Sequence, residues 1–520
     1  MRLRFLFLAA LALGACAGPP SPTPSPTPSP TPTLAPPAQG EMRVAVTGAA
    51  PHLDLQREVS EWATLYGPGP AYARLMRFDV SGPAPALRVV CDLCSSWRWA
   101  DPLTFEAVIS PDARWQDAEG FASRPVTPQD VVFSLERLRE PGSPHAHLLA
   151  GVETIEPVGT DTVRLRLSTP DAGLPLALAS PYAVVLAPDS LDRVDLRTGR
   201  VVGAGPWRFT AQLSGGAVLE RWDAYGLGPQ PSVERITFQR TVSLEVGVEL
   251  LRSGAVDIAQ VTEEQWAALE QEGYRSVVLQ RQGRGVAFGL NARRAPFDDS
   301  TVRRAAFLAL DPQAALEAHF GIGAWGLGIP LEEPGWALVP DGVFNDPAAA
   351  RALLAGRTPA FTLLVANFGE AYVAFGEALA DQLEYAGFDV RVVAATRGEY
   401  LDGVWTARAF DAFVGPLPPT DQPNDFALAL LHTDGASNVT AAGSAALDAA
   451  IDAYATHADA GARAGLVADI QRLALEGAWV FMPAIAAERW ALGPRIEALP
   501  TDLPLGAGEL WTGLRLDTEP

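Results

Sequence analysis

Hydrophobic and polar positions recur along the chain with two different periods, which predicts a mixed α/β protein. The clearest helical pattern is residues 128–138, PQDVVFSLERL, where apolar residues return at every third or fourth position. Thr127 can N-cap this helix, and Asp130 stands where it completes a capping box. Pro128 falls on the first helical position, where its missing N–H costs nothing. The local pattern therefore predicts a well-capped helix.

Other stretches alternate with the period of a strand. Residues 42–48 predict a first strand, and residues 152–167, VETIEPVGTDTVRLRL, predict a hairpin with a Gly-Thr-Asp turn. From residue 361 the pattern reads strand (361–366), helix (372–385), strand (388–395). This order predicts a parallel β-α-β unit.

Length and charge narrow the class of protein. At 520 residues the chain is too long for one core, so we expect two or three lobes. The formal net charge is −22, and all 39 basic residues are arginine. An acidic chain repels phosphate backbones, which argues against nucleic acid as a partner.

The N-terminus reads as an export signal followed by a tether. A positive start precedes an apolar run at 5–13 that is too short to span a bilayer. Residues 13–16, LGAC, resemble the lipobox of bacterial lipoproteins, which implies lipidation at Cys16. The alternative is an ordinary secretory signal with an incidental cysteine. The repeat PSPTPSPTPSPTPT at 20–33 favours extended polyproline II, so residues 17–40 are predicted to be a linker.

Several motifs together resemble one protein family. Trp115-x-Asp117, followed by VTPQDVVFSLERL at 126–138, resembles the signature of extracellular solute-binding proteins of bacterial ABC importers (family 5). This branch holds oligopeptide-, dipeptide- and nickel-binding members. Further matches follow in the family's order: GAGPWRF at 203–209, SGAVDI at 253–258, and the stretch 288–303. The resemblance extends over nearly all of the chain from residue 41.

The resemblance implies a two-lobed periplasmic-binding-protein fold of class II, with an extra subdomain inserted in lobe 1. A solute, in the first instance a peptide, would be held between hinged lobes and passed to an ABC permease and its ATPase. We expect an extracytoplasmic monomer anchored to the membrane by its lipid. The expected divisions are a signal peptide (1–16), a linker (17–40), lobe 1 (41–80), the subdomain (81–185), lobe 1 again (186–280), lobe 2 (281–490) and a return to lobe 1 (491–520).

The resemblance also implies a ligand-contacting region between Trp405 and Phe426. The family's Gly-Trp-x-x-Asp-x-x-Asp-Pro-x-x-Phe is altered here, because Pro419 replaces an Asp that commonly pairs with a peptide amino terminus. Sugars or metal chelates therefore stay open as cargo. Asp421 and Asn424 either contact the ligand or form a polar turn. The expected ligand contacts are Tyr66, Trp405, Asp421, Asn424 and Phe426.

The search for catalytic motifs favours a non-enzyme. The chain has no HExxH, no Walker-type loop and no GxSxG elbow. Residues 321–326 spell GxGxxG but follow a helix, whereas a dinucleotide loop must follow a strand. An anchored hydrolase is one alternative, and it would need a nucleophile or metal triad that these residues do not supply. A ligand-binding sensor or scaffold is the other.

Two short pairs are candidate sites for other chemistry. Cys91 and Cys94 are expected to form a short-loop disulfide in an oxidising compartment; a redox-active CxxC or half a zinc site are the alternatives. His145 and His147 lie in a predicted outer loop, where we expect them to be solvated, since no third ligand is indicated. Neither a metal nor another cofactor is therefore predicted.

Overall fold

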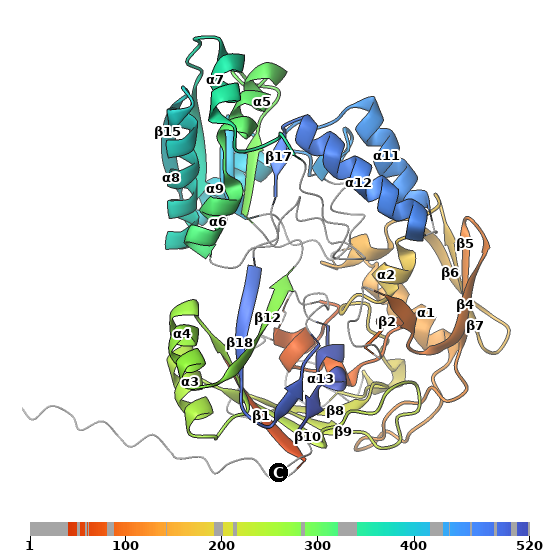
Figure 1. Ribbon diagram of the computed structural model, residues 1–520. Coiled ribbons are helices and arrows are strands. Elements are labelled where there is room, and N and C mark those ends of the chain that lie inside the picture. The colour runs from red at the N-terminus through yellow and green to blue at the C-terminus, as the bar shows by residue number, and fades with distance from the viewer. Residues whose placement is uncertain are drawn as a thin grey trace, which may run out of the picture. The chain divides into compact units, whose positions relative to one another are not determined.

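Two separate hydrophobic cores divide the protein into two lobes, as the computed structural model shows (Figure 1). One core draws on residues from Met42 to Leu279 and again from Trp490 to Leu514, while the other spans Val286 to Met482. The chain thus passes from lobe 1 to lobe 2 and back. The structure describes residues 40–48, 52–57, 60, 62–80, 88–141, 143–191, 201–211, 216–281, 286–320, 341–416, 430–435, 437–457, 460–482, 486–500 and 507–517.

Lobe 1 is organised around a seven-stranded sheet in which β1 runs parallel to both of its neighbours, β10 and β11. In spatial order the strands are β12 (Arg275–Arg281), β18 (Ala486–Leu492), β11 (Ile258–Val261), β1 (Glu41–Val46), β10 (Arg235–Arg240), β9 (Ala217–Arg221) and β8 (Trp207–Ala211). Its helices are α3 (Leu244–Arg252), α4 (Glu263–Gln271) and α13 (Glu509–Gly513), and two small sheets pair β2 (Met76–Phe78) with β3 (Val89–Cys91) and β19 (Ile496–Ala498) with β20 (Arg515–Leu516).

A four-stranded antiparallel sheet forms the inserted part of lobe 1, on the right of Figure 1. Its strands are, in spatial order, β4 (Cys94–Asp101), β5 (Thr104–Ile109), β7 (Thr162–Leu167) and β6 (Val152–Val158), with helices α1 (Pro128–Leu138) and α2 (Leu174–Leu178). The hairpin predicted at 152–167 is confirmed as β6 and β7. Glu106 on β5 pairs with Arg98 and Arg164 from the two neighbouring strands.

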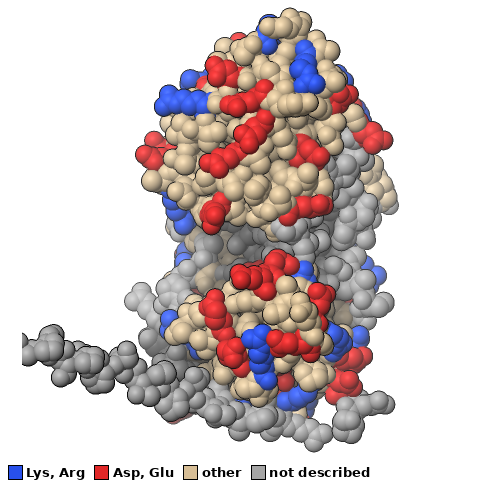
Figure 2. All heavy atoms as spheres, turned by 60° about the vertical axis from the view of Figure 1, so that its left-hand side comes forward, with Lys and Arg blue, Asp and Glu red and all other residues tan. Residues whose placement is uncertain are grey.

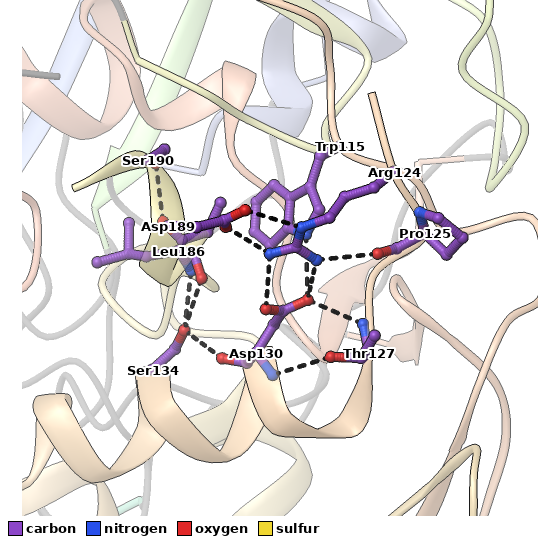
Figure 3. A network of polar contacts seen from close by, with 10 residues as sticks. Trp115, Arg124, Pro125, Thr127, Asp130, Ser134, Leu186, Asp189 and Ser190 are labelled. Atoms are coloured by element: carbon purple, nitrogen blue, oxygen red, sulfur yellow. Dashed lines mark hydrogen bonds and ion pairs between the residues drawn. The ribbon is translucent and has the colours of Figure 1, made fainter. Parts of the chain in front are cut away.

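Helix α1 is confirmed together with its cap. The Thr127 side chain accepts from the backbone N–H of Asp130, and the Asp130 carboxylate accepts from the backbone N–H of Thr127. The same carboxylate accepts from Trp115 Nε1 (3.2 Å) and from two nitrogens of Arg124 (2.7 and 3.0 Å), as Figure 3 shows. Arg124 also reaches Asp189 (2.6 Å). The cap therefore joins this helix to the loop before it and to the segment after α2.

Lobe 2 contains a five-stranded sheet with helices packed against it. The predicted parallel unit is confirmed, because β14 pairs parallel with β15 and α8 lies between them in the chain. In spatial order the strands are β15 (Asp389–Ala395), β14 (Ala360–Ala366), β16 (Ala412–Pro416), β13 (Val286–Leu290) and β17 (Val480–Phe481). The helices are α5 (Ser300–Ala309), α6 (Pro312–Phe320), α7 (Pro347–Leu354), α8 (Glu370–Tyr385), α9 (Arg397–Tyr400), α11 (Ala445–Thr456) and α12 (Ala460–Glu476).

The return to lobe 1 comes earlier than the predicted residue 491. Strand β18 already belongs to the lobe 1 sheet from Ala486, where it pairs with Arg281 of β12. It also pairs with β11 on its other side, so it is an interior strand. The apolar pattern continues through the crossing and does not mark where one sheet ends, which is why the boundary was placed too late.

None of the helices in the described part of the chain is both long enough and apolar enough to span a bilayer.

Candidate functional site

The strand directions in lobe 1 single out one edge of its sheet. Strand β12 ends at Arg281, next to Ala486 at the start of β18. The chain crosses to lobe 2 after β12 and crosses back to lobe 1 before β18, so both crossings adjoin this end of the sheet. Strand β11 is antiparallel to β18, and β1 and β10 run with β11. The carboxyl ends of β1, β10 and β11 therefore lie at the edge from which the chain crosses. We call this end of the sheet, where these strands stop, the hinge-side edge of lobe 1.

Lobe 2 shows the same arrangement. Strand β13 begins at Val286, directly after the first crossing, and Val286 pairs with Pro416 at the end of β16. Strands β14 and β15 run parallel to β16, so their carboxyl ends also lie at this hinge-side edge. In open sheets with parallel strands, ligands bind outside the carboxyl ends. Both lobes thus turn a binding-competent edge toward the two crossings.

An aromatic platform lies beside the hinge-side edge of lobe 1. Tyr66, which ends a short π-helix (Trp62–Tyr66), has its ring 6.1 Å from that of Trp490 and 5.5 Å from that of Phe238. Trp511 on α13 lies within 6.3 Å of all three rings. Its indole N–H donates to Leu65 O (2.6 Å), which fixes the π-helix against α13. Tyr66, one of the predicted contacts, is therefore held in a rigid, partly buried position.

A carboxylate borders this platform. Glu488, two residues after the start of β18, accepts from Trp490 Nε1 (3.3 Å). Burial raises the pKa of Tyr66 well above its usual value, and the nearby Glu488 charge raises it further. Tyr66 is therefore a neutral hydrogen-bonding phenol throughout the physiological range and cannot serve as a base. Its surroundings suit binding rather than proton transfer.

The hinge-side edge of lobe 2 carries a cation on an aromatic ring. Phe368 follows β14 and Arg397 follows β15, and the Arg397 guanidinium carbon lies 5.6 Å from the Phe368 ring centroid. Tyr400 packs edge-on against Phe368 (5.8 Å) and its hydroxyl donates to Pro416 O (3.0 Å). Burial raises the pKa of Tyr400, so this hydroxyl stays protonated as a donor. The group is thereby tied to the last residue of β16.

Trp405, the second predicted contact that the structure describes, also lies in this region. It is half-buried in a π-helical turn (Leu401–Thr406) after α9, with its ring 6.1 Å from that of Phe413 on β16. Tyr66 belongs to lobe 1 and Trp405 to lobe 2, so the predicted contacts divide between the lobes. The other predicted contacts, together with the lipidation site, lie outside the described residues: Asp421, Asn424, Phe426 and Cys16.

A buried ionic cluster adjoins the aromatic platform through α13. Glu509, two residues before Trp511, pairs with Arg74 and also accepts from the Phe78 N–H (3.1 Å). The backbone N–H of Arg74 donates to the Asp92 carboxylate (2.7 Å). Burial raises the pKa of Asp92, although the charge of Arg74 acts to lower it. Within the described part of the chain, the second Glu509 oxygen and Arg77 Nε have no hydrogen-bond partner, and both residues line a cavity of about 30 Å³. That volume is enough for about one water molecule.

In the structure, the cysteine pair forms a disulfide and His145 of the histidine pair is buried. Cys91 and Cys94 are joined by a disulfide at the turn between β3 and β4. His145 is buried, with its ring stacked at 3.9 Å on Tyr182, so the expectation that it is solvated is wrong. Stacking on a neighbour more than thirty residues away leaves no local sequence signal. Among the described residues, no three His, Cys, Asp or Glu side chains are grouped to hold a metal ion.

Surface charge bears on the choice of partner. On the face shown in Figure 2, acidic and basic side chains are interspersed over both lobes, without a broad basic patch among the coloured residues. With a net charge of −22, this surface is unsuited to polyanions.

Comparison with known proteins identifies the family. The profile described as bacterial extracellular solute-binding proteins, family 5 (middle), matches residues 88–438, more than half of the chain. The chain belongs to this family. The resemblance seen in the sequence is thereby confirmed.

Curated relatives of this family 5 protein are distant in sequence. A glutathione-binding protein of Pectobacterium atrosepticum is 27% identical over 279 residues, covering 51% of this chain and 52% of that protein. The dipeptide-binding protein of Escherichia coli is 22% identical over 394 residues, covering 69% and 72%. The chain spans about half the length of the first curated relatives that it matches.

Solved structures extend the likeness over nearly the whole chain. HbpA2 from Haemophilus parasuis superposes with a TM-score of 0.80 at 18% identity, covering 92% of this chain and 100% of that one. The unliganded open form of a periplasmic murein tripeptide-binding protein gives 0.78 at 17%, covering 94% and 99%. The predicted two-lobed α/β fold of this family 5 protein is confirmed.

Most residues of the aromatic platform in lobe 1 and of the group around Phe368 in lobe 2 were not predicted from the sequence. Phe368 and Arg397 each follow a strand that the sequence predicts. The carboxyl ends of strands in a parallel β-α-β unit are expected to lie at a binding edge, so the positions of these two residues could have been recognised from the sequence. Trp490 and Trp511 offered no such signal, because they meet Tyr66 only through the returning segment of the chain.

Proposed function

We propose that this family 5 protein captures a small solute, in the first instance a peptide, between its lobes and delivers it to an ABC permease. The observation that carries this is the convergence of strand carboxyl ends and both chain crossings at one edge of each lobe. A solute bound at both edges makes its full set of contacts only when the lobes close. It therefore shifts the balance from the open to the closed form.

A peptide is the preferred candidate for the solute because relatives of this chain are named as peptide-binding proteins, among them the glutathione- and dipeptide-binding proteins. Tyr66 is proposed to line the solute from lobe 1, with Trp405, Asp421, Asn424 and Phe426 on lobe 2. The neutral Tyr66 phenol and the aromatic platform suit contacts to main-chain amides and apolar side chains. The chain makes and breaks no bond in this scheme, and transport energy comes from the ATPase of the importer.

Native mass spectrometry of residues 41–520 tests the cargo. A retained solute with the mass of a small peptide is the expected result. The intrinsic tryptophan emission should also change on adding a tripeptide library, since Trp490 and Trp511 contact Tyr66. If no peptide, sugar or metal alters the emission or the melting temperature, the solute-binding proposal fails.

We further propose that a lipid on Cys16 and the Pro-rich linker tether the folded part to the outer side of the membrane. At ~3.1 Å per residue, a polyproline linker of this length reaches tens of ångströms. Cys16→Ser should release the full-length protein into the soluble fraction. A variant that stays with the membrane would contradict the lipid anchor.

A further inference from the structure

We propose that the cavity beside α13 is a binding site for one resident water molecule, which links Arg77 to Glu509. The two residues come from opposite parts of the sequence, because Arg77 lies on β2 and Glu509 begins α13. Both line the same cavity of about 30 Å³, a volume that accommodates about one water molecule. The site is independent of the proposed capture of a solute between the lobes.

Glu509 has one carboxylate oxygen that receives no hydrogen bond from the surrounding chain. Its Oε1 accepts from Arg74 and from the backbone N–H of Phe78 (3.1 Å). Its Oε2 is buried, and no group in the described ranges donates to it. Only 7% of the Glu509 side chain is exposed, so bulk solvent has little access to this oxygen. A buried carboxylate oxygen without a donor is costly, and a donor placed in the cavity removes that cost.

Arg77 presents the complementary group. Its Nη1 donates to the carbonyl of Phe78 (3.2 Å), but its Nε–H is buried and finds no acceptor among the residues that the structure describes. A Cβ at Gly228 would lie 3.1 Å from Arg77 Nη2 and 3.4 Å from the Tyr225 hydroxyl oxygen, so the glycine leaves room for the guanidinium. The residues around the cavity thus include a buried donor and a buried acceptor that do not bond to each other.

The charges around the cavity favour a neutral occupant. Arg74 and Arg77 supply two positive charges, and Asp92 and Glu509 supply two negative ones. A metal cation would lie beside two guanidinium groups, and a halide would lie beside two carboxylates, so either ion would meet like charges in a poorly hydrated site. A water molecule instead donates to Glu509 and accepts from Arg77. Tyr225 also lines the cavity, and its hydroxyl oxygen can accept the second hydrogen of the water.

The water adds a second link between β2 and α13, next to the direct hydrogen bond from Phe78 to Glu509. Strand β2 pairs with β3, and the chain enters the inserted four-stranded sheet directly after β3. Helix α13 belongs to the last segment of the chain. The water therefore strengthens the place where this last segment packs against the entry to the inserted part.

Crystals of the chain from residue 41, which contains both hydrophobic cores, test the proposal at a resolution that shows ordered water. Untreated crystals are compared with crystals soaked in rubidium chloride and in sodium bromide, because Rb⁺ and Br⁻ give anomalous signals that water lacks. We expect one oxygen-sized peak within hydrogen-bond distance of Glu509 Oε2 and Arg77 Nε in all three, without an anomalous signal. An anomalous peak at this place, an empty cavity, or a direct contact between Arg77 and Glu509 overturns the inference.

Two arginine variants are crystallised in parallel. Arg77→Leu removes the donor and should lose the peak, while the pair of Arg74 with Glu509 stays in place. Arg88→Leu is the matched control, because Arg88 has 72% of its side chain exposed and pairs with Asp79 away from the cavity; it should keep the peak. A peak of unchanged height in Arg77→Leu overturns the bridging role of Arg77. If Arg77→Leu does not fold, the three wild-type maps decide the question by themselves.

Discussion

Replacing Glu509 by alanine tests the ionic cluster that adjoins the aromatic platform. Arg74 and Glu509 keep only 9% and 7% of their side chains exposed, so the change leaves a buried guanidinium without its counter-charge. Breaking a buried pair in this way costs about 3–5 kcal/mol. The Phe78 N–H also loses its acceptor, which adds about 1 kcal/mol. Asp92, which lies in the same cluster, offsets part of the loss, so we expect about 3 kcal/mol.

Urea unfolding followed by tryptophan emission measures this loss, because Trp511 lies two residues from Glu509 and reports on lobe 1. Arg74→Met combined with Glu509→Leu should recover most of the stability, since it removes both charges. Glu140→Ala is the matched control: its pair with Arg57 is exposed on the glutamate side (56%) and should cost less than about 1 kcal/mol. A Glu509→Ala loss equal to that of the control, or a double variant no better than the single one, would refute the reasoning.

Three further changes test separate parts of the fold. Asp130→Ala removes the acceptor shared by Trp115, Arg124 and Thr127. It should cost about 2–4 kcal/mol and speed amide exchange in α1; unchanged exchange would contradict the role of the cap. For Glu106→Gln, Arg164 holds the folded pKa of Glu106 below its usual value. The stabilisation is therefore present above about pH 4.3 and lost as pH falls through the folded pKa. The difference in unfolding free energy from the wild type should shrink between pH 7 and pH 3, and a constant difference would count against this pair. Gly289→Ala would place a Cβ 2.3 Å from the Phe413 ring, which should cost at least about 1–3 kcal/mol; an unchanged melting temperature would contradict the pairing of β13 with β16.

Features encoded by neighbouring residues were predictable from the sequence. The capping box of α1 uses residues three apart, and the β14–α8–β15 unit is read from one continuous pattern. The family resemblance rests on such local motifs, which is why the two-lobed fold followed from it. Tyr66 and Trp405 were named through the resemblance, and whether they contact a ligand stays a prediction.

Features made by distant residues were not predictable in the same way. Glu509 and Arg74 are 435 positions apart, and nothing in either neighbourhood indicates the other. His145 looked like a solvated loop residue because its partner Tyr182 is not adjacent in sequence. The predicted return to lobe 1 at residue 491 is five residues later than the start of β18, because strand periodicity does not say which sheet a strand joins.

The interior position of β18 has a consequence for biogenesis. Lobe 2 is one continuous stretch of sequence, and all of its strands that the structure describes have emerged once residue 481 has been made. The lobe that begins nearer the N-terminus must keep a gap between β11 and β12 until residues 486–492 arrive. The usual N-terminal-first order of maturation is therefore reversed here, and a nascent or truncated chain ending before β18 exposes two unpaired strand edges to quality control.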